Sequence, residues 1–518
     1  MRFRRPKGSA RQHHRAVASG LGIVLFVAML WWSASAPVTT PTLAPSSVTV
    51  LPHTTASDES GFEPILDLLL PNAQLQFDPN VPLTYQMHNC LRGRDGSKFG
   101  LKDAGFVQSQ NQRESGNVHS VYDDAQVIVS CNNVKPARQV SNDPRVNGKR
   151  LVSTSVGIVE EGCLGGGKKD QLVCRRALAT LFGCEYDSLG IQPRQYLLSL
   201  KSDCTKILTR AQHEPSRPWL LKPSASLRGR GIKYFGTSQS LLEDISDCES
   251  EFHVDDIIQE YVVNPALLNG FKFDVRTWML IASIDPLVLF YREGFARVAN
   301  AKYEEASQDT FAHITNLEGQ QQKRADHTTY LRSFDEVQQD LHETYGFPKD
   351  YMKQGAFKRQ IMRAHTFAAL AQFLPEPAAM DNRKGFYHLF ACDSVVGQDQ
   401  QVHLLECNGF PAESQQVLLE KRVRIGKQAD PQLVWKEMIS LVLNLHLDPD
   451  TLLPDNSTYS NSSHSYRKQG WWKTPPVITG KAFGAKHGYR YGSWDLAFNE
   501  LETPFSSLNA CEVDFMER

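Results

Sequence analysis

The residues best suited to chemistry fall in four blocks between residues 219 and 412, and the first block reads WLLKPSASLRGRGIKYF. An apolar run ends at Lys222, and the polar loop after it carries Arg228, Gly229 and Gly231 before β-type residues resume. Glycine permits close backbone approach, so the N–H groups of such a loop can surround phosphates, and a lysine on the entering strand can reach an anionic oxygen. The block therefore predicts a strand–loop–strand unit that is either a phosphate cradle or a plain hairpin.

The second block, residues 257–283, places alternating charges on a strand. Lys272, Asp274 and Arg276 point to one face, because side chains alternate along an extended chain. The strand continues into Trp-Met-Leu-Ile-Ala, which is typical of a core strand, so the three charges indicate a polar site more than a surface salt bridge. Just upstream is a strand-like edge that suits backbone recognition of an adenine, formed by Gln259, Glu260, Tyr261 and Val262.

The third block begins at Tyr291 and ends a short amphipathic segment with Arg297. A guanidinium at this position can hold a carboxylate or a phosphate through two parallel hydrogen bonds. His313 and Asn316 follow in a segment that we expect to be a loop. Each of these residues, taken alone, is also typical of an exposed polar side chain.

The fourth block, residues 388–412, brings oxygen ligands together on a hairpin. One strand carries Asp393, and after a turn the next strand ends in Leu-Leu-Glu-Cys-Asn. Glu406 and Asn408 are two residues apart and share a face, and the antiparallel return brings that face beside Asp393. Two carboxylates and an amide oxygen are the hard ligands that suit Mg²⁺ bridging nucleotide phosphates. The block predicts a magnesium site, with a polar hairpin end as the alternative.

In order and spacing, these blocks resemble the tubulin–tyrosine ligase-like family of ATP-grasp ligases over residues 80–425, most densely from 219 to 411. The resemblance implies an α/β (α+β) ATP-grasp fold with a smaller N-terminal α/β lobe. Two departures stand out. The family's N-x-x-P-G element is absent, with Lys168 or Lys169 in the place of its following lysine, and Pro411-Ala412 stands where the family has proline–serine.

The chemistry implied by the resemblance is ATP- and Mg²⁺-dependent amide ligation of the polyglutamylase type. An amino acid, glutamate first, would be joined through an acyl phosphate to a carboxylate of an acidic protein such as a tubulin tail. The resemblance implies catalytic roles for Lys272, Asp274, Arg276 and Arg297, nucleotide binding by Lys222, Arg228, Gly229, Gly231, Gln259, Glu260, Tyr261, Val262, His313 and Asn316, and metal binding by Asp393, Glu406 and Asn408. In these roles the three cationic side chains would orient the acceptor carboxylate, and Asp274 would position them.

The N-terminal residues predict a membrane anchor. Residues 1–15 are basic and form a cytosolic tail, residues 16–36 form an uncharged signal-anchor, and residues 37–80 form a Ser/Thr/Pro-rich stalk. The positive-inside bias then places the catalytic domain in the lumen of the ER or Golgi. A cleaved signal peptide, a targeting presequence and a cytosolic, microtubule-associated protein are the alternatives. The sequons at Asn456 and Asn461 agree with a lumen.

The rest of the chain divides into N-terminal and central lobes at 81–215, the ATP-grasp catalytic domain at 216–425 and a C-terminal extension at 426–518. The net charge of −1 offers no argument for a nucleic-acid partner. The ten cysteines show no zinc-binding spacing and permit disulfides, and Cys407 is expected to face the core. The basic and aromatic stretch 466–491 either binds an acidic polymer or is a solvated face.

Three other functions remain open from the sequence. A luminal ATP-grasp ligase acting on an acceptor other than tubulin keeps the same chemistry. A luminal single-pass glycosyltransferase could use Asp448-Pro449-Asp450 to bind a metal, although that tripeptide also suits a turn and leaves the four blocks unexplained. A catalytically inactive binding protein would keep the fold without turnover.

Overall fold

The computed structural model describes most of the chain between residues 163 and 409 and short segments elsewhere. The described residues are 84–88, 107–108, 127–130, 150–154, 163–164, 166–224, 231–245, 248, 256–284, 287–315, 331–373, 386–409, 433–434, 437–438, 441–442, 490–491 and 493–499. They all belong to one compact unit, Gly61–Arg518.

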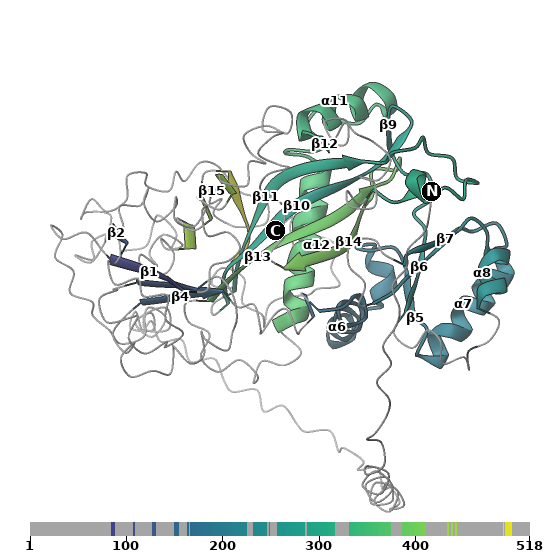
Figure 1. Cartoon of the computed structure of the whole chain (residues 1–518), viewed down its shortest axis with the longest axis horizontal. Coiled ribbons are helices and arrows are strands. Elements are labelled where there is room, and N and C mark those ends of the chain that lie inside the picture. The colour runs from purple at the N-terminus through teal and green to yellow at the C-terminus, as the bar shows by residue number, and fades with distance from the viewer. Residues whose placement is uncertain are drawn as a thin grey trace, which may run out of the picture. The chain divides into compact units, whose positions relative to one another are not determined.

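A large sheet forms the centre of this unit (Figure 1). Its four long or central strands are antiparallel and run in the order β11 (Leu287–Val298), β10 (Phe271–Ile284), β13 (Phe386–Val396) and β14 (Val402–Gly409). Alternation along β10 sends Phe273 and Val275 into the core and leaves the charged residues between them on the other face.

Short strands extend the large sheet on both sides. The parallel strands β1 (Thr84–His88), β2 (Val107–Gln108), β3 (Val127–Ser130) and β4 (Arg150–Thr154) join it where β4 pairs with β13. On the other side, β16 (Trp494–Asn499) pairs with β11 and with β15 (Arg490–Tyr491). The N-terminal lobe and the C-terminal extension therefore both contribute strands to the sheet that carries the charged blocks. Two-residue strands, β9 (Leu267–Leu268) and β12 (Leu331–Arg332), pair with β10 and β11.

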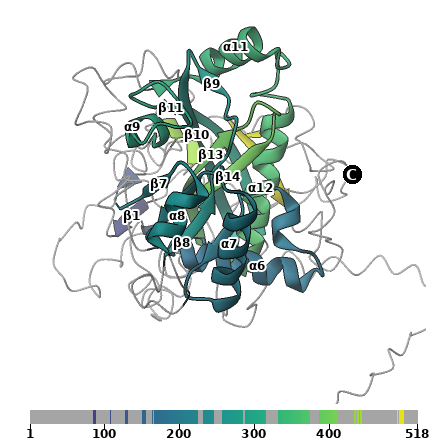
Figure 2. The ribbon, with the colours of Figure 1, turned by 90° about the vertical axis from the view of Figure 1, so that its right-hand side faces the viewer.

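A second, four-stranded sheet lies beside the first. Its strand order is β5 (Gln195–Leu197), β8 (Ile257–Glu260), β6 (Trp219–Lys222) and β7 (Lys233–Phe235). The helices α7 (Lys201–His213) and α8 (Ser238–Asp244) pack on this sheet, as Figure 2 shows. Trp219, Leu221 and Ile258 of the strands and Ile207 of α7 share a small separate core.

The remaining helices support the large sheet. The 18-residue helix α12 (Ala356–Phe373) buries most of its length against the sheet and against α6 (Lys168–Leu181). The helix α11 (Phe334–Tyr345) begins with a reciprocal Ser333–Glu336 capping box and ends at Gly346, whose φ of 70° is left-handed. A 3₁₀ turn (Tyr186–Leu189) and the short helix α9 (Thr310–His313) complete the described elements.

Three disulfides join described cysteines: Cys163–Cys174, Cys204–Cys248 and Cys392–Cys407. In the part of the chain that the structure describes, every cysteine is in a disulfide. Cys407 is buried in the core, as its place in the sequence predicts. Sequence spacing left the pairing open because the partners come from separate elements.

The mixed α/β class predicted from the sequence is confirmed, but the membrane-anchored luminal protein predicted with it is wrong. No helix among the described residues has the length and apolar composition needed to cross a bilayer. The predicted tail 1–15, anchor 16–36 and stalk 37–80 lie outside the described residues, as do Asn456 and Asn461.

Strand β16 is expected to be essential to the stability of the sheet. Leu496 is fully buried, and Lys358 of α12 forms a buried ion pair with Asp495 at 2.8 Å. Replacing Leu496 with alanine should lower the free energy of unfolding by about 2–5 kcal/mol, the usual cost of such a core truncation. Chemical denaturation would measure it, with Leu181→Ala, at a 61% exposed position, as the matched control. Equal stability of both variants would contradict a structural role for β16.

Candidate active site

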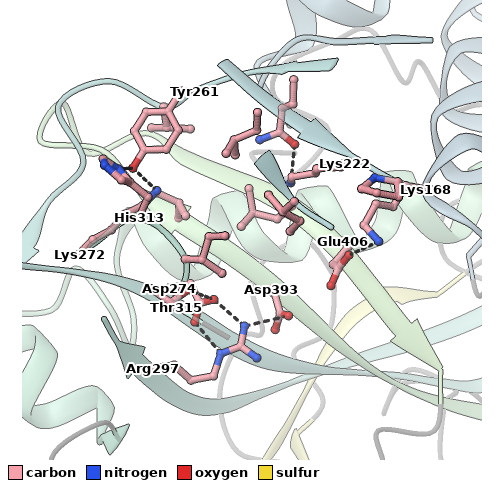
Figure 3. Close-up of a pocket in the computed structure, with 18 residues that line it drawn as sticks. Lys168, Lys222, Tyr261, Lys272, Asp274, Arg297, His313, Thr315, Asp393 and Glu406 are labelled. Atoms are coloured by element: carbon pink, nitrogen blue, oxygen red, sulfur yellow. Dashed lines mark hydrogen bonds and ion pairs between the residues drawn. The ribbon is translucent and has the colours of Figure 1, made fainter. Parts of the chain in front are cut away.

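A pocket opens between the two sheets and collects most of the residues that the sequence singled out (Figure 3). The small sheet supplies one wall and the polar face of the large sheet supplies the other. The lining consists of Lys168, Leu220, Lys222, Pro223, Ile232, Gln259, Tyr261, Val262, Lys272, Asp274, Arg297, His313, Ile314, Thr315, Asp393, Val395, Leu405 and Glu406.

Strand register places the charged side chains in rows across the large sheet. Asp274 of β10 is directly opposite Arg297 of β11, and Arg276 of β10 is opposite Asp393 of β13. Asp393 is in turn opposite Glu406 of β14. Directly paired residues project to the same face of a sheet, with Cβ atoms about 4.5–5.5 Å apart. Residues more than a hundred positions apart in the sequence therefore meet on one wall of the pocket.

Two arginines and two aspartates form a buried network on this wall. Arg297 donates to Asp274 Oδ1 at 2.7 Å, and its Nη2 lies 2.9 Å from Asp393 Oδ2. Arg276 binds the same Asp393 through Nε to Oδ1 at 2.8 Å and through Nη2 to Oδ2 at 2.9 Å. Thr315 donates its hydroxyl to Asp274 at 2.6 Å. Each guanidinium is thus held in a defined orientation by carboxylates from neighbouring strands.

The network keeps Asp393 and Arg297 ionised although they are buried. Burial by itself would raise the pKa of the Asp393 carboxyl, but the adjacent Arg276 and Arg297 guanidiniums lower it below its ordinary value. Burial would likewise lower the pKa of Arg297, and the two aspartates raise it instead. Asp393 and Arg297 therefore remain oppositely charged at physiological pH.

Two buried lysines enter the pocket beside this network, Lys222 from β6 of the small sheet and Lys272 from β10 of the large sheet. Lys222 at the end of β6 donates to Gln259 Oε1 at 2.7 Å. Lys272 donates to the Tyr261 hydroxyl at 2.6 Å and lies 4.0 Å from the centroid of that ring. Tyr261 also contacts His313 Nδ1 at 2.9 Å, and His313 is an aromatic partner of the neighbouring Tyr234. The lysines thus rest on neutral partners, which leaves their charges uncompensated at close range.

Burial perturbs both lysines strongly. It lowers the pKa of Lys222 to about 8, with opposing contributions from Glu406 and Lys168, and lowers the pKa of Lys272 to about 7, helped by repulsion from Lys222. Burial also lowers the pKa of His313 to about 4, so that its imidazole is neutral. A buried cation of this kind is stabilised by an anionic ligand, because the ligand compensates for the hydration of the charge that burial removed.

The carboxylates of the metal block lie where a divalent cation could bind with a nucleotide. Asp393 and Glu406 are cross-strand neighbours, Asn408 Nδ2 donates to Glu406 Oε1 at 3.3 Å, and Lys168 Nζ lies 3.5 Å from Glu406 Oε2. Among the described residues, no group of three His, Cys, Asp or Glu side chains could hold a metal by itself. Mg²⁺ in phosphoryl-transfer sites takes only one or two carboxylates and completes its shell with phosphates and water. The donor set of two carboxylates and one amide fits that requirement.

Most but not all of the predicted residues line the pocket. Arg276 and Asn408 adjoin it through Asp393 and Glu406. The Glu260 side chain instead faces Tyr196 of the small sheet and Arg217 just before β6, and β8 is an internal strand where an edge was expected. Gly231 is described and has a left-handed φ of 72°, whereas Arg228, Gly229 and Asn316 lie outside the described residues.

The sequence analysis missed part of the lining. Thr315 was overlooked although it sits between His313 and Asn316, the two residues predicted in that segment, and it holds Asp274 in place. Lys168 was only a loose candidate, because the sequence around it lacks the expected proline–glycine element. Its ion pair with Glu406 comes from the packing of α6 against β14, which periodicity in the sequence does not reveal.

Residues 170–424 match the tubulin-tyrosine ligase family, and this segment contains the small sheet, the four central strands of the large sheet and the arginine–aspartate network of the pocket wall. The chain contains a domain of the tubulin-tyrosine ligase family. It is 29% identical over 242 residues to protein polyglycylase TTLL10 of Macaca fascicularis, covering 42% of this chain and 38% of that protein. It is 29% identical over 273 residues to the inactive polyglycylase TTLL10 of Homo sapiens, covering 48% and 38%.

A further relative is tubulin polyglutamylase TTLL5 of Mus musculus, 27% identical over 267 residues, which cover 48% of this chain and 18% of that protein. This chain therefore spans well under half the length of these curated relatives. The relatives include enzymes named for tubulin, which supports the correction of the luminal localisation.

The pKa of Lys272 predicts how stability depends on pH. Its folded value of about 7 lies below the ordinary 10.5, so between these pH values the unfolded chain binds more protons and the free energy of unfolding rises with pH. Lys272→Met should remove this rise, which is at most about 1.4 kcal/mol per pH unit, most clearly between pH 7 and 8, where Lys222 contributes little. Urea denaturation at several pH values would measure it, with the exposed Lys201→Met as control. A pH dependence unchanged by Lys272→Met would contradict a depressed pKa.

Proposed function

We propose that the chain is an ATP-dependent amino-acid ligase that joins an amino acid to a side-chain carboxylate of an acidic protein. The observation that carries the proposal is the cross-strand row Arg276–Asp393–Glu406, with Arg297 and Asp274 beside it and two buried lysines in the same pocket that donate to neutral side chains. Membership of the ligase family supports the reaction class.

The lysine side of the pocket suits the polyphosphate. Lys222 and Lys272 are buried, and each donates to an uncharged side chain, so phosphate oxygens would gain two strong charge-assisted donors. The left-handed Gly231 at the end of the glycine loop allows the chain to turn back toward Pro223 on this side. Tyr261 and Val262, next to these lysines, could flank the base.

Asp393, Glu406 and Asn408 would hold Mg²⁺, which would neutralise the charge of the phosphates during transfer. The side chains around these ligands orient them. Arg276 and Arg297 fix the plane of the Asp393 carboxylate, and Lys168 restrains Glu406. Such restraint matters because phosphoryl transfer depends mainly on positioning and electrostatics.

The arginine wall suits the carboxylate that is activated. An acceptor carboxylate oxygen would attack the γ-phosphorus of ATP and ADP would leave, and the amine of the incoming amino acid would then displace phosphate to form the amide. Arg276 and Arg297 are held by aspartates from two strands and could stabilise the negative charge that develops on the acyl group. Asp274, fixed by Thr315, keeps Arg297 in place.

We propose glutamate as the added amino acid and an acidic tail such as that of tubulin as the acceptor. The relatives include a tubulin polyglutamylase and polyglycylases, so glycine is the specific alternative. An inactive protein is the other alternative, because one relative is named as inactive. The paired charges of the described site favour activity. The glycosyltransferase alternative leaves these pairs unexplained, and Asp448–Asp450 lies outside the described residues.

Glu406→Gln is expected to abolish ligation almost completely, since it removes one of two carboxylates from the metal set at constant size. The assay would supply ATP, Mg²⁺, a glutamate-rich peptide and radiolabelled glutamate or glycine, and would follow label incorporation and ADP release. Glu437→Gln, a carboxylate outside the pocket, is the control. If the wild-type protein incorporates neither amino acid and releases no ADP, the proposal is overturned. If Glu406→Gln turns over as fast as the wild type, the metal assignment is overturned.

Arg276→Ala should lower ligation by about a hundredfold or more while the affinity for ATP changes little, because its guanidinium is assigned to the acyl group. Arg276 is 13% exposed, so its loss disturbs the core less than the loss of Arg297. Product formation and ATP-analogue binding would be measured in parallel. Arg176→Ala, which removes a similar ion pair with Asp203 outside the pocket, is the control. If ATP affinity falls as far as ligation, the arginine is a phosphate ligand.

A further inference from the structure

The strand that carries Glu406 and Asn408 is held on the side away from the pocket by contacts that the function just described does not use. β14 is an outer strand and, among the described strands, pairs with β13 alone. Its pairing is interrupted by a bulge, because Asp393 is opposite Glu406 while Ser394 is opposite Leu404. Leu405 is the extra residue and lies immediately before the first metal ligand of β14.

Because the bulge lies next to a proposed metal ligand, a change of strand register there would change which way the ligand points. Side chains alternate between the two faces of a strand, so a slip by one residue beyond the bulge would turn Glu406 and Asn408 from the pocket to the core. Hydrogen bonds to β13 alone offer little protection, since the strand already accommodates one shift there. Something else must select the observed register.

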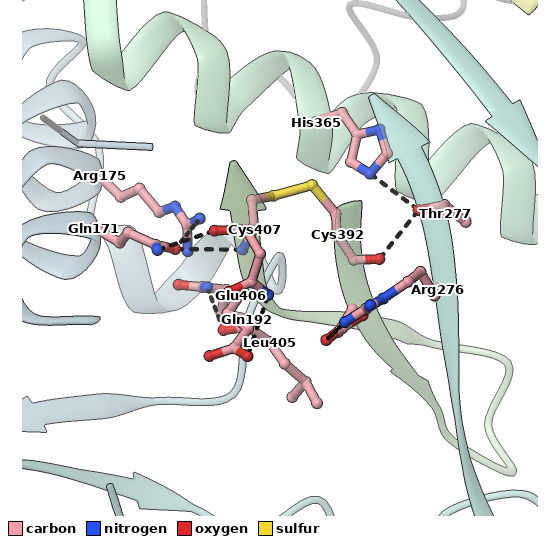
Figure 4. Close-up of a disulfide and its surroundings, with 12 residues drawn as sticks. Gln171, Arg175, Gln192, Arg276, Thr277, His365, Cys392, Leu405, Glu406 and Cys407 are labelled. Atoms are coloured by element: carbon pink, nitrogen blue, oxygen red, sulfur yellow. Dashed lines mark hydrogen bonds and ion pairs between the residues drawn. A yellow bond between two sulfur atoms is a disulfide. The ribbon is translucent and has the colours of Figure 1, made fainter. Parts of the chain in front are cut away.

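The Cys392–Cys407 disulfide is one such restraint (Figure 4). The two cysteines are directly opposite each other, between the Asp393–Glu406 pair and the Ala391–Asn408 pair. Both sulfurs lie on the core face, so the bond joins the strands behind the ligands without entering the pocket. The Cα atoms are 4.0 Å apart, close to the spacing of a pair that makes no backbone hydrogen bonds to each other.

Gln171 of α6 supplies the second restraint. At a pair without mutual backbone hydrogen bonds, the N–H and C=O groups of Cys407 face away from β13. Gln171 Nε2 donates to Cys407 O at 3.2 Å, and Cys407 N donates to Gln171 Oε1 at 3.5 Å. One amide side chain thus takes the place of a neighbouring strand. Gln171 is buried and is itself held by Arg175 Nη2, which donates to its Oε1 at 3.2 Å.

Neighbouring contacts secure the bulge itself. Leu404 N donates to Ile191 O at 2.8 Å, and Gln192 Nε2 lies 3.5 Å from Leu405 O. We propose that Gln171 and the Cys392–Cys407 disulfide are positioning elements that hold β14 in the register in which Glu406 and Asn408 face Asp393. The inference rests on the proposed function, because it concerns the geometry of the proposed metal ligands.

The test compares two glutamines that make the same kind of contact with β14. Gln360 of α12 donates to Gln400 O and accepts from Val402 N, both at 2.9 Å, at the far end of the strand. Gln171→Met and Gln360→Met each remove two side-chain-to-backbone bonds at β14 or the turn before it, at nearly constant volume, and Gln171→Met also removes a bond to Gly166 O. Binding of Mn²⁺ in the presence of a non-hydrolysable ATP analogue would be measured by calorimetry and electron paramagnetic resonance, and the melting temperature of each variant would be recorded.

We expect Gln171→Met to weaken Mn²⁺ binding about 10- to 100-fold, the usual effect of removing support behind a metal ligand. Gln360→Met should lower the melting temperature comparably and keep Mn²⁺ affinity within about threefold of the wild type, because its end of β14 carries no ligand. Binding of the ATP analogue without metal should be unchanged in both. Equal Mn²⁺ affinity in the two variants would overturn the proposal.

The disulfide is tested in parallel by Cys392→Ala with Cys407→Ala, and Cys204→Ala with Cys248→Ala is the control on the small-sheet side. Weaker Mn²⁺ binding in the Cys392/Cys407 double variant, but not in the Cys204/Cys248 double variant, supports the proposal. If the Cys392/Cys407 double variant binds Mn²⁺ with wild-type affinity, the disulfide has no positioning role. If the first pair does not fold, the glutamine variants still decide. A wild-type protein that binds no Mn²⁺ overturns this inference and the proposed metal site together, whereas loss of Mn²⁺ in Glu406→Gln but not in Gln171→Met overturns this inference alone.

Discussion

The antiparallel register of β11, β10, β13 and β14 is the constraint on which the candidate site depends. It sets Arg297 against Asp274, Arg276 against Asp393 and Asp393 against Glu406. Each contact is between residues that neighbour each other only because the strands are aligned in this way, and the same alignment sends the alternating apolar residues to α12 and α6. Packing on one face and charge on the other are therefore two consequences of one register, and neither can change without the other.

Removing so many charged side chains from water costs free energy, and two groups of side chains in the pocket differ in how that cost is offset. On the large sheet, arginines and aspartates pair through bidentate contacts, which keep the side chains oriented. Elsewhere in the pocket, Lys222 of the small sheet and Lys272 of β10 have neutral hydrogen-bond partners, and burial lowers the pKa of each. A compensated wall is rigid, whereas an uncompensated pair of cations gains energy from an anion. This asymmetry is the arrangement expected of a site that holds a polyphosphate opposite an activated carboxylate.

The elements outside the central strands act mainly by supporting that register. Strand β16 comes from the C-terminal part of the chain and completes the sheet beside β11, with the Lys358–Asp495 ion pair linking it to α12. Next to β14, the helix α6 hydrogen-bonds to the strand through Gln171 and contributes Lys168 to the pocket. The domain divisions drawn along the sequence therefore cut through one sheet, because strands that are distant in sequence are neighbours in space.

The sequence alone determined the fold class, the family and nearly all the chemical groups of the site. Alternation along β10 and the E-x-N spacing of β14 are local properties, so Lys272, Asp274, Arg276, Glu406 and Asn408 could be assigned to faces without a structure. What only the tertiary structure decided are the relations between elements: that Arg276 and Arg297 share Asp393, that Thr315 and Lys168 enter the site, that Glu260 points away from it, and that Cys392 pairs with Cys407. The N-terminal charge pattern predicted a luminal protein because it was interpreted apart from the rest of the chain, whose relatives include enzymes named for tubulin. Strand order, register and helix packing arise from contacts across the whole chain, and periodicity within one segment carries no information about which segment becomes its neighbour.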